Sequence, residues 1–326
     1  MFYSKMKKVI LINFFTIVIF IVFFEFVLRF FFSFTPQGMD KGLILEDNDI
    51  SEHSPNYSGG LVFGKKVYTD ENGFRVPYEN FSEKKFKKKI IFLGGSVTFG
   101  TGVNEEDSFV GILRKNVKAQ VINAAVIGSD LRNNSLLLKK INLSKDVINI
   151  FINFGLDDIP NFDNKEPNRR GERLEGLRKI PFVSSINDFI KSKSVIFVWL
   201  KGVIFDPSKN YYLYDVGLYK NLEKVSRIDK YLESMREINL KNNSKIVFLI
   251  IPMEYQTRGS NCKKRDIAQN IIKEKLNKYN FKYIDLIEDF CKNKKTEKLF
   301  LYKDPAHLSK KGHEVVYKKI INYLRN

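Results

Sequence analysis

The most apolar stretch of the chain lies close to its amino terminus. Residues 9–24 include only two polar side chains, and the apolar character continues to Phe34 past Glu25 and Arg29. A helix over residues 9–34 would rise about 39 Å, which exceeds the roughly 30 Å of a bilayer's hydrocarbon core. The pattern therefore predicts one transmembrane helix at residues 9–34.

A cleaved signal peptide is the competing interpretation of this stretch. Signal peptidases need small residues at the cleavage site, whereas residues 30–34 read Phe-Phe-Phe-Ser-Phe. We therefore expect the helix to be retained as an anchor. Three lysines lie within residues 1–8, whereas after the helix Lys41 alone accompanies Glu46, Asp47, Asp49 and Glu52. The positive-inside rule places residues 1–8 in the cytoplasm and everything after residue 35 outside.

From residue 89 onward, short apolar runs alternate with longer segments of helical periodicity. The short runs predict strands at Lys89–Leu93, Gln120–Ala124, Val147–Asn153, Lys245–Ile251 and Phe281–Leu286. The longer segments predict helices at Asp107–Lys118, Asp130–Asn142, Leu218–Leu240, Lys263–Tyr279 and Lys310–Leu324. This alternation is typical of a parallel sheet with right-handed crossovers and helices on both faces. The predicted fold class is α/β, with three layers (αβα) around a central parallel sheet.

Between the predicted anchor and this domain, the chain is polar and rich in turn residues. Residues 67–75 read Val-Tyr-Thr-Asp-Glu-Asn-Gly-Phe-Arg, which predicts a small hairpin that turns near Asn72-Gly73. We expect residues 35–83 to form a stalk or an edge hairpin, without a core of its own. His53 lies in the polar part, where a lone histidine is typical of the surface.

A second break interrupts the predicted α/β domain, which spans residues 84–326. The insertion at about 160–217 contains the apolar run 194–200, Ser-Val-Ile-Phe-Val-Trp-Leu. Seven residues are too few to cross a bilayer, and Lys201 follows directly. We expect this run to pack under the domain; a lid or a membrane-facing contact is the alternative.

The composition adds a strong positive charge. The 326 residues carry 55 Lys and Arg against 37 Asp and Glu, a formal net charge of +18, and such a balance raises nucleic acids and anionic surfaces as partners. The basic residues are mixed with acidic ones along the chain, and the one dense run, 84–89, comes directly before the first predicted strand. Since the sequence has no zinc-finger, RNP or helix-turn-helix pattern, we expect solvated lysines and no nucleic-acid partner.

The only two cysteines are Cys262 and Cys291. They form no Cys-x-x-Cys pair, and no histidines stand at the spacing of a zinc site. We therefore expect no structural metal. In an extracytoplasmic domain the two cysteines can form one disulfide, but two free thiols fit the sequence equally well.

The candidate chemistry starts where the first predicted strand of the α/β domain ends. The chain leaves this strand through Gly94-Gly95 and presents Ser96. Parallel sheets place their working groups at the carboxyl ends of strands, and the two glycines permit a turn that side chains would crowd. On its own, the motif would indicate an ordinary strand–turn–helix junction with a serine cap.

Three further blocks fall at positions that this fold would bring to the same edge. The second strand ends shortly before Gly128, Gly155-Leu-Asp157-Asp158 follows the third, and Asp304-Pro-Ala-His307 precedes the last helix. An acid three residues before a histidine can bond the ring Nδ1, which leaves Nε2 to face a hydroxyl from another strand. His313 is expected to pack against or cap the last helix.

In this order, the four blocks resemble the SGNH (GDSL-type) hydrolase superfamily. Its members have a Gly-x-Ser on a strand, a lone Gly, a Gly-x-Asn-Asp and a terminal Asp-x-x-His. The resemblance covers about residues 86–326, and an anchored amino terminus followed by Asn-Gly-Phe-Arg is similar to membrane-attached members. It implies a flavodoxin-like αβα fold, with Ser96 as nucleophile, His307 as general base and Asp304 as the residue that orients the imidazole. No cofactor or metal is expected.

The resemblance also implies an oxyanion hole, and here the sequence departs from the family. The backbone N–H groups of Ser96 and Gly128 would bind the oxyanion, joined in the family by an asparagine side chain. The aligned residue is Asp157, and an ionised carboxylate has no N–H to donate. Three outcomes stay open: a weak enzyme, a protonated Asp157, or replacement of the donor by Asn153 or another group.

The expected function is that of a membrane-anchored, extracytoplasmic serine esterase or O-acyltransferase. It would act through an acyl-serine on acyl esters, in the first place acetyl esters, of cell-envelope or surface polysaccharide. Its partners would be the lipid bilayer, through the amino-terminal helix, and an acylated glycan or other ester. The alternative is a catalytically weak or inactive SGNH-like module that binds a glycan or scaffolds an envelope complex; the departure at Asp157 would be its sign.

Overall fold

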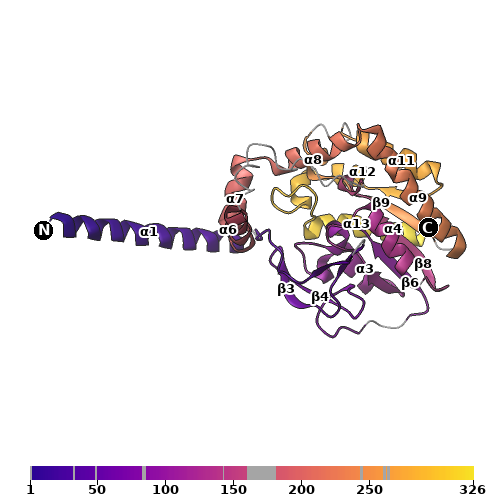
Figure 1. Cartoon of the computed structure of the whole chain (residues 1–326), viewed down its shortest axis with the longest axis horizontal. Helices are drawn as coiled ribbons and strands as arrows, with labels where there is room; N and C mark the ends of the chain where they lie inside the picture. Colours follow the sequence, from indigo (N-terminus) through magenta and orange to yellow (C-terminus); the bar gives the residue numbers. More distant parts are fainter. Residues whose placement is uncertain are drawn as a thin grey trace.

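The computed structural model describes residues 2–31, 34–47, 50–82, 86–141, 143–159, 181–242, 245–259, 262 and 265–326. Helix α1 (Phe2–Phe31) projects from an α/β body (Figure 1). Its segment Met6–Phe31 is long and apolar enough to cross a membrane, judged by length and composition. The large apolar side chains along it are mostly exposed.

The body is built on one eight-stranded sheet with the order β10-β9-β8-β6-β7-β5-β4-β3. The strands of this sheet are β3 (Ser58–Val62), β4 (Lys65–Thr69), β5 (Arg75–Val76), β6 (Lys89–Leu93), β7 (Gln120–Asn123), β8 (Val147–Asn153), β9 (Ile246–Ile250) and β10 (Lys282–Asp285). The five strands from β10 to β7 pair in parallel, and β5, β4 and β3 continue the sheet antiparallel. The predicted α/β class with a parallel central sheet is confirmed.

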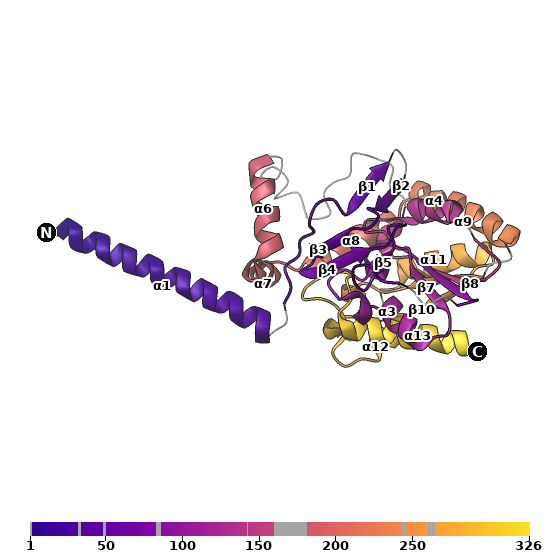
Figure 2. The same cartoon turned by 90° about the horizontal axis from the view of Figure 1, so that it is seen from below.

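Helices cover both faces of the sheet, which gives the predicted three layers (Figures 1 and 2). One face carries α4 (Leu131–Lys140), α8 (Pro207–Leu218), α9 (Leu222–Asn242) and α11 (Ile267–Lys278); the other carries α3 (Phe109–Asn116), α12 (Ile287–Cys291) and α13 (Lys310–Arg325). In β6, Ile91 and Leu93 face the first set, and Ile90 and Phe92 face the second. A strand buried on both faces is continuously apolar, which explains why this run has no polar alternation.

The segment predicted as a stalk is part of the body. A two-stranded unit of β1 (Ile44–Asp47) and β2 (Ile50–His53) precedes β3. The predicted hairpin is formed by β4 and β5, and β5 also pairs with β7, so the segment extends the main sheet. Of the two alternatives, the structure has the edge hairpin and not a separate stalk. The pairing of β5 with β7, far along the chain, leaves no local pattern in the sequence.

The surface position expected for His53 is wrong. Its side chain is 2% exposed, and its Nε2 accepts a hydrogen bond from the Ile127 N–H at 3.1 Å. The ring packs edge-on against Phe99. His313, by contrast, packs as expected: it is buried, and its Nδ1 accepts a hydrogen bond from the Phe109 N–H at 3.2 Å.

The predicted insertion at 160–217 is described only in part, because residues 160–180 lie outside the described residues. The remainder forms α6 (Pro181–Lys193), α7 (Val195–Ile204) and α8. The apolar run 194–200 lies largely in α7, which contacts α1 and whose Val195 and Val198 are buried. Packing against the body is seen at Gly202, which lies close to Tyr302, and a membrane-facing contact of the exposed side stays a prediction.

Cys262 and Cys291 form a disulfide with their Cα atoms 5.9 Å apart. This bond links the chain ahead of α11 to the last residue of α12. Of the two possibilities open from sequence, the structure contains the disulfide.

Candidate active site

The nucleophile candidate stands at the turn between β6 and α2 (Ser96–Phe99). Gly94 makes this turn with a φ of +145°, and a Cβ there would lie 2.5 Å from the Thr98 Oγ1. Glycine is therefore required at this position. Ser96 is the first residue of α2, and the first N–H groups of a helix have no partner within the helix. Its hydroxyl and its N–H both belong to the edge where the parallel strands end.

Ser96, His307 and Asp304 form one hydrogen-bonded chain. The Ser96 Oγ lies 2.8 Å from the His307 Nε2, and the His307 Nδ1 lies 2.9 Å from the Asp304 Oδ2. Since an ionised carboxylate can only accept, the imidazole proton sits on Nδ1, and Nε2 is free to accept the serine proton. The other oxygen of Asp304, Oδ1, accepts backbone N–H groups from Ala306 at 3.0 Å and His307 at 2.7 Å.

The electrostatics of this chain favour a general base. Burial by itself lowers the pKa of His307, but the Asp304 carboxylate, with a smaller contribution from Asp157, raises that pKa above its usual value. For Asp304, burial acts to raise the pKa, but His307 and the two backbone N–H groups outweigh it and the pKa lies below its usual value. Asp304 is thus ionised at neutral pH and stabilises the imidazolium that forms when His307 takes a proton.

The predicted oxyanion residues line one pocket beside Ser96. This pocket has a volume of about 200 Å³ and is lined by Gly128, Asn153 and Asp157 together with the serine. Gly128 has a φ of +82°, which a side chain would strain. The structure therefore brings Ser96, Gly128 and Asp157 to the same cavity, as the four sequence blocks predict.

The two aspartates after β8 have different environments. The Asp158 side chain is buried, and its Oδ2 accepts the Gly155 N–H at 2.7 Å, so it stabilises the turn into the 3-10 helix Leu156–Asp158. Asp157 is only half-buried and faces the pocket, where its charge acts on His307. Asn153 is 4% exposed, and its Oδ1 has no hydrogen-bond partner among the described residues. Its amide is thus the one asparagine side chain that lines this pocket within the described chain.

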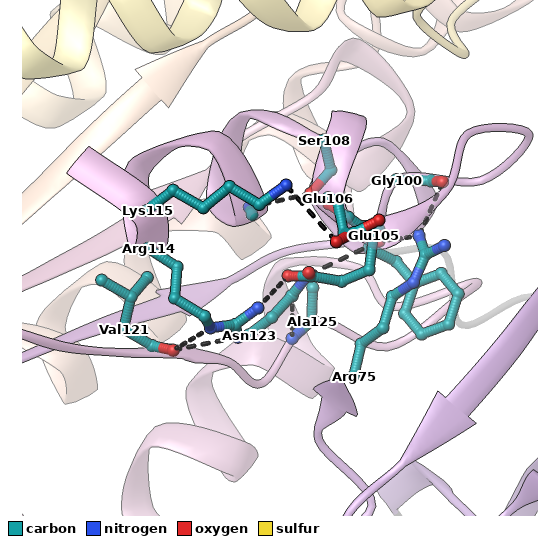
Figure 3. Close-up of polar contacts among 12 residues, drawn as sticks. Arg75, Gly100, Glu105, Glu106, Ser108, Arg114, Lys115, Val121, Asn123 and Ala125 are labelled. Atoms are coloured by element: carbon teal, nitrogen blue, oxygen red, sulfur yellow. Dashed lines mark hydrogen bonds and ion pairs between the residues drawn. The ribbon is translucent and has the colours of Figure 1, made fainter. Parts of the chain in front are cut away.

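Sequence reasoning did not find the residue that holds the nucleophile's helix. Arg75 is 1% exposed, and its guanidinium donates hydrogen bonds to the carbonyl oxygens of Phe99, Gly100 at 2.6 Å and Val103 at 2.7 Å. Figure 3 shows this side chain pointing at the Gly100 carbonyl. Burial lowers the pKa of Arg75 to about 10, so the group stays charged at neutral pH. Three carbonyls around the end of α2 are thus held by one cation.

An ion pair lies beside these contacts of Arg75. Arg114 pairs with Glu105, whose side chain is buried, and also donates to the Val121 carbonyl at 3.0 Å (Figure 3). The sequence signal for Arg75 was the Asn-Gly-Phe-Arg segment, but a hairpin motif does not show which groups its arginine contacts.

Two more residues from the amino-terminal segment shape the site. His53 fixes the Ile127 N–H, next to Gly128, and because burial, followed by the charge of Arg75, lowers its pKa to about 3, the ring is a neutral acceptor. The ring of Phe63 lies 5.0 Å from the ring of His307, measured between centroids. Residues 35–83 therefore contribute side chains that contact His307 and the backbone beside Gly128.

A metal centre finds no support in the part of the chain that the structure describes. No group of three or more His, Cys, Asp or Glu side chains there is arranged to hold an ion.

Neither a family model nor a curated protein matches this chain. Solved structures similar to it include a lipolytic protein of the G-D-S-L family from Veillonella parvula, at 12% identity over 73% of this chain and 99% of that chain, with a TM-score of 0.45. Two others are the acetyl xylan esterase AlAXEase (17% identity, 72% and 99% coverage, TM-score 0.44) and an acetylxylan esterase from Geobacillus stearothermophilus (14%, 74% and 95%, 0.40). The contacts of Ser96, His307 and Asp304, and not these likenesses, carry the functional conclusion.

Proposed function

We propose that this chain is a membrane-anchored serine esterase or O-acyltransferase. The observation that carries the proposal is the continuous path from the Ser96 Oγ through both nitrogens of His307 to a buried, ionised Asp304, with contacts of 2.8 and 2.9 Å. A serine hydroxyl becomes a nucleophile when a neighbouring base can take its proton. An ordinary strand–turn–helix junction with a serine cap needs no histidine and no buried aspartate beside a pocket.

The geometry supports a two-step acyl transfer. The His307 Nε2 takes the proton from the Ser96 Oγ as that oxygen attacks the ester carbonyl, and the backbone N–H groups of Ser96 and Gly128 bind the oxyanion. His307 then gives its proton to the leaving alcohol, which produces an acyl-serine. Water or a sugar hydroxyl attacks in the second step, with His307 again as the base.

The third oxyanion donor in our proposal is the amide of Asn153. Asn153 lines the pocket with Ser96 and Gly128, whereas Asp157 carries a charge that would oppose a developing oxyanion. The two ends of an asparagine amide are assigned from their partners, and here the buried oxygen has none. With its oxygen buried, the NH₂ end of this amide is the end that can donate to an oxyanion in the pocket.

An extracytoplasmic location is supported by two features. Helix α1 has the length and apolarity of a membrane span, and its flanking lysines favour a cytoplasmic amino terminus. The Cys262–Cys291 disulfide is typical of an oxidising compartment. We therefore propose acyl esters of cell-envelope or surface polysaccharide as substrates, with acetyl as the transferred group.

Release of acetate tests this proposal. The full chain in detergent is expected to release acetate from an acetylated polysaccharide and from an activated acetyl ester, and Ser96→Ala is expected to reduce both to background. Ser226→Ala, which removes an exposed serine on α9, is the matched control and should leave both rates unchanged. Acetate release that survives Ser96→Ala would overturn the proposal. Appearance of the label on an added glycan acceptor distinguishes transfer from hydrolysis.

The second candidate is an inactive module that binds a glycan. The charge of Asp157 in the pocket favours it, because this charge is unsuited to an oxyanion. It predicts saturable binding of the polysaccharide, no acetate release, and binding unchanged by Ser96→Ala.

A further inference from the structure

Helix α7 connects the apolar helix α1 to the loop that carries the catalytic residues. On one side, the Trp199 ring packs edge-on against Phe24 of α1, with 5.3 Å between the centroids. On the other side, a Cβ at Gly202 would lie 2.7 Å from the Tyr302 Cε1, so α7 is in close contact with the residues just before Asp304. The same tyrosine stacks on Phe34 at 4.1 Å.

One charged residue of α1, Glu25, satisfies the amino terminus of α7. The Glu25 carboxylate accepts the N–H groups of Val195 at 2.9 Å and Ile196 at 3.0 Å, and the hydroxyl of Ser194 at 3.0 Å. Arg29 in turn pairs with Glu25 at 2.7 Å. Unpaired backbone donors are costly in a lipid environment. With these partners, the start of α7 can lie next to lipid without exposing its N–H groups.

Apolar side chains cover the outer side of α7. Leu200, Val203, Ile204 and Phe205 are 43, 61, 67 and 48% exposed. Val195, Val198 and Gly202 are buried against the protein, so the helix is apolar on its covered and its exposed sides alike. A helix of that kind belongs in a protein core or in a membrane. Phe189 and Ile190 near the end of α6 are also exposed, at 66 and 38%.

Both helices run crosswise to α1, on its side of the body. Figure 1 shows this for α7 and Figure 2 for α6. If α1 spans a bilayer, both therefore lie in the plane of the membrane. Residues 9–24 of α1 rise about 24 Å, which puts Trp199, beside Phe24, near the outer boundary of a roughly 30 Å hydrocarbon core. Tryptophan is typical of that boundary.

We propose that α7 and the end of α6 lie in the outer surface of the bilayer as an in-plane membrane contact. This inference rests on the anchoring role proposed above for α1. The occupant of the exposed apolar face is phospholipid: acyl chains meet Val203 and Ile204, and Lys193 and Lys201, which flank the face, reach the headgroup phosphates. Because α7 contacts Tyr302, the membrane contact also fixes the distance of the Asp304–His307 loop from the membrane surface. The substrate ester must therefore be presented close to the membrane surface.

A single tryptophan moved onto the exposed face tests this contact. The chain contains one tryptophan, so Trp199→Phe combined with Ile204→Trp leaves one reporter on α7. Trp199→Phe combined with Leu222→Trp is the matched control, since Leu222 on α9 is 84% exposed. The full chains are reconstituted in phosphatidylcholine–phosphatidylglycerol vesicles that carry bromine near the headgroups or near the bilayer midplane.

We expect the reporter at position 204 to be quenched most by lipid brominated near the headgroups, to emit at a blue-shifted wavelength and to resist aqueous acrylamide. The control reporter at position 222 should be quenched by acrylamide alone. Equal behaviour of the two reporters in chains that resist alkaline extraction would overturn the in-plane contact while leaving the anchor intact. Shielding of position 204 from both lipid bromine and acrylamide would overturn it in favour of a protein partner. Release of the chain by alkali would contradict the anchor and this inference together.

Discussion

At the scale of single residues, the site contains a proposed general base, His307, and a carboxylate, Asp157, that is unusual beside an oxyanion. His307 has the partners of a general base on both ring nitrogens. Asp157 faces the same pocket and adds to the rise in the pKa of His307. A carboxylate there stabilises the imidazolium but repels an oxyanion. It therefore favours proton transfer to His307 and opposes stabilisation of the oxyanion.

The pH dependence of the wild type follows from the raised pKa of His307. The base must be neutral to accept the serine proton, so kcat/KM is expected to fall as the pH drops through that pKa. The midpoint of this acid limb should lie above the 6.5 of an unperturbed histidine. Rates of ester hydrolysis measured across the neutral range check this. An acid limb centred well below 6.5 would contradict the assigned contact between Asp304 and His307.

Asp157→Asn is expected to make the enzyme faster and to move the acid limb to lower pH. The substitution removes a negative charge, so the pKa of His307 falls and the base stays neutral further into the acid range. Because our proposal already assigns the third donor to Asn153, the gain comes from removing a charge that opposes the oxyanion, and we expect kcat to rise by less than the roughly 10²–10³ that a whole donor is worth. Asp158→Asn is the control, because Asp158 bonds the Gly155 backbone instead. A lower rate with an unmoved acid limb would show that Asp157 acts differently.

At the scale of elements, the site depends on a short helix held from outside. α2 has only four residues, too few for stable helix formation on their own. Its last turn is held by Arg75, which belongs to β5 and which the hairpin brings under the end of α2. Ser96, the proposed nucleophile, is thus positioned by an antiparallel extension of the sheet.

Arg75→Met is expected to destabilise the fold and to lower activity. The change removes Arg75 from three buried carbonyls. Those of Phe99 and Gly100 keep longer bonds from Asn123 at 3.5 Å and from the Val103 N–H at 3.2 Å, so the main cost, about 1–3 kcal/mol, falls on the Val103 carbonyl. Chemical denaturation measures the loss, and Arg75→Lys should recover part of it because one ammonium can still bond some of these carbonyls. Arg236→Met removes a long, exposed ion pair of 3.8 Å and should change stability by less than about 0.5 kcal/mol. Equal stability of the two Met variants would contradict a stabilising role for the contacts of Arg75 with these carbonyls.

Local patterns predicted the parallel half of the fold well. β6 and β8 have the predicted bounds, and α3 and α13 differ from theirs by only a few residues. These elements are specified by continuous apolar runs and by helical periodicity, both of which can be read locally. The order of the four blocks then indicated which strand ends meet.

The misses share one physical cause, which is pairing over long distances in the chain. The partner of Arg75 in the sheet is Asn123, and the partner of His53 is Ile127. Neither contact has a local signature. The packing of α7 on α1 has the same cause. From the sequence, Glu25 is interpreted as a charge near the end of the membrane helix, and only the structure shows that it bonds Ser194.

At the scale of the whole molecule, the disulfide closes a loop in the carboxyl-terminal part of the body. Cys262 and Cys291 are 29 residues apart, and the loop contains α11, β10 and α12. Cross-linking a loop of that length restricts the unfolded chain and stabilises the fold by about 3.6 kcal/mol in the chain-entropy model.

Cys262→Ser with Cys291→Ser is therefore expected to lower the free energy of unfolding by about 2–4 kcal/mol. Denaturant titration with and without dithiothreitol measures it. The reductant should bring the wild type to the stability of the double variant and leave that variant unchanged. A wild type insensitive to the reductant under unfolding conditions would contradict a solution disulfide.

The whole account depends on one reaction, the attack of Ser96 on an electrophile with His307 as its base. Labelling of the folded full chain with a fluorophosphonate, followed by mass spectrometry of the peptides, measures that reaction directly. We expect one adduct on Ser96 in the wild type, its rate reduced by about 10³–10⁴ in Asp304→Asn and its loss in His307→Ala. No adduct on Ser96 in the folded wild type, or equal labelling after His307→Ala, would contradict the account.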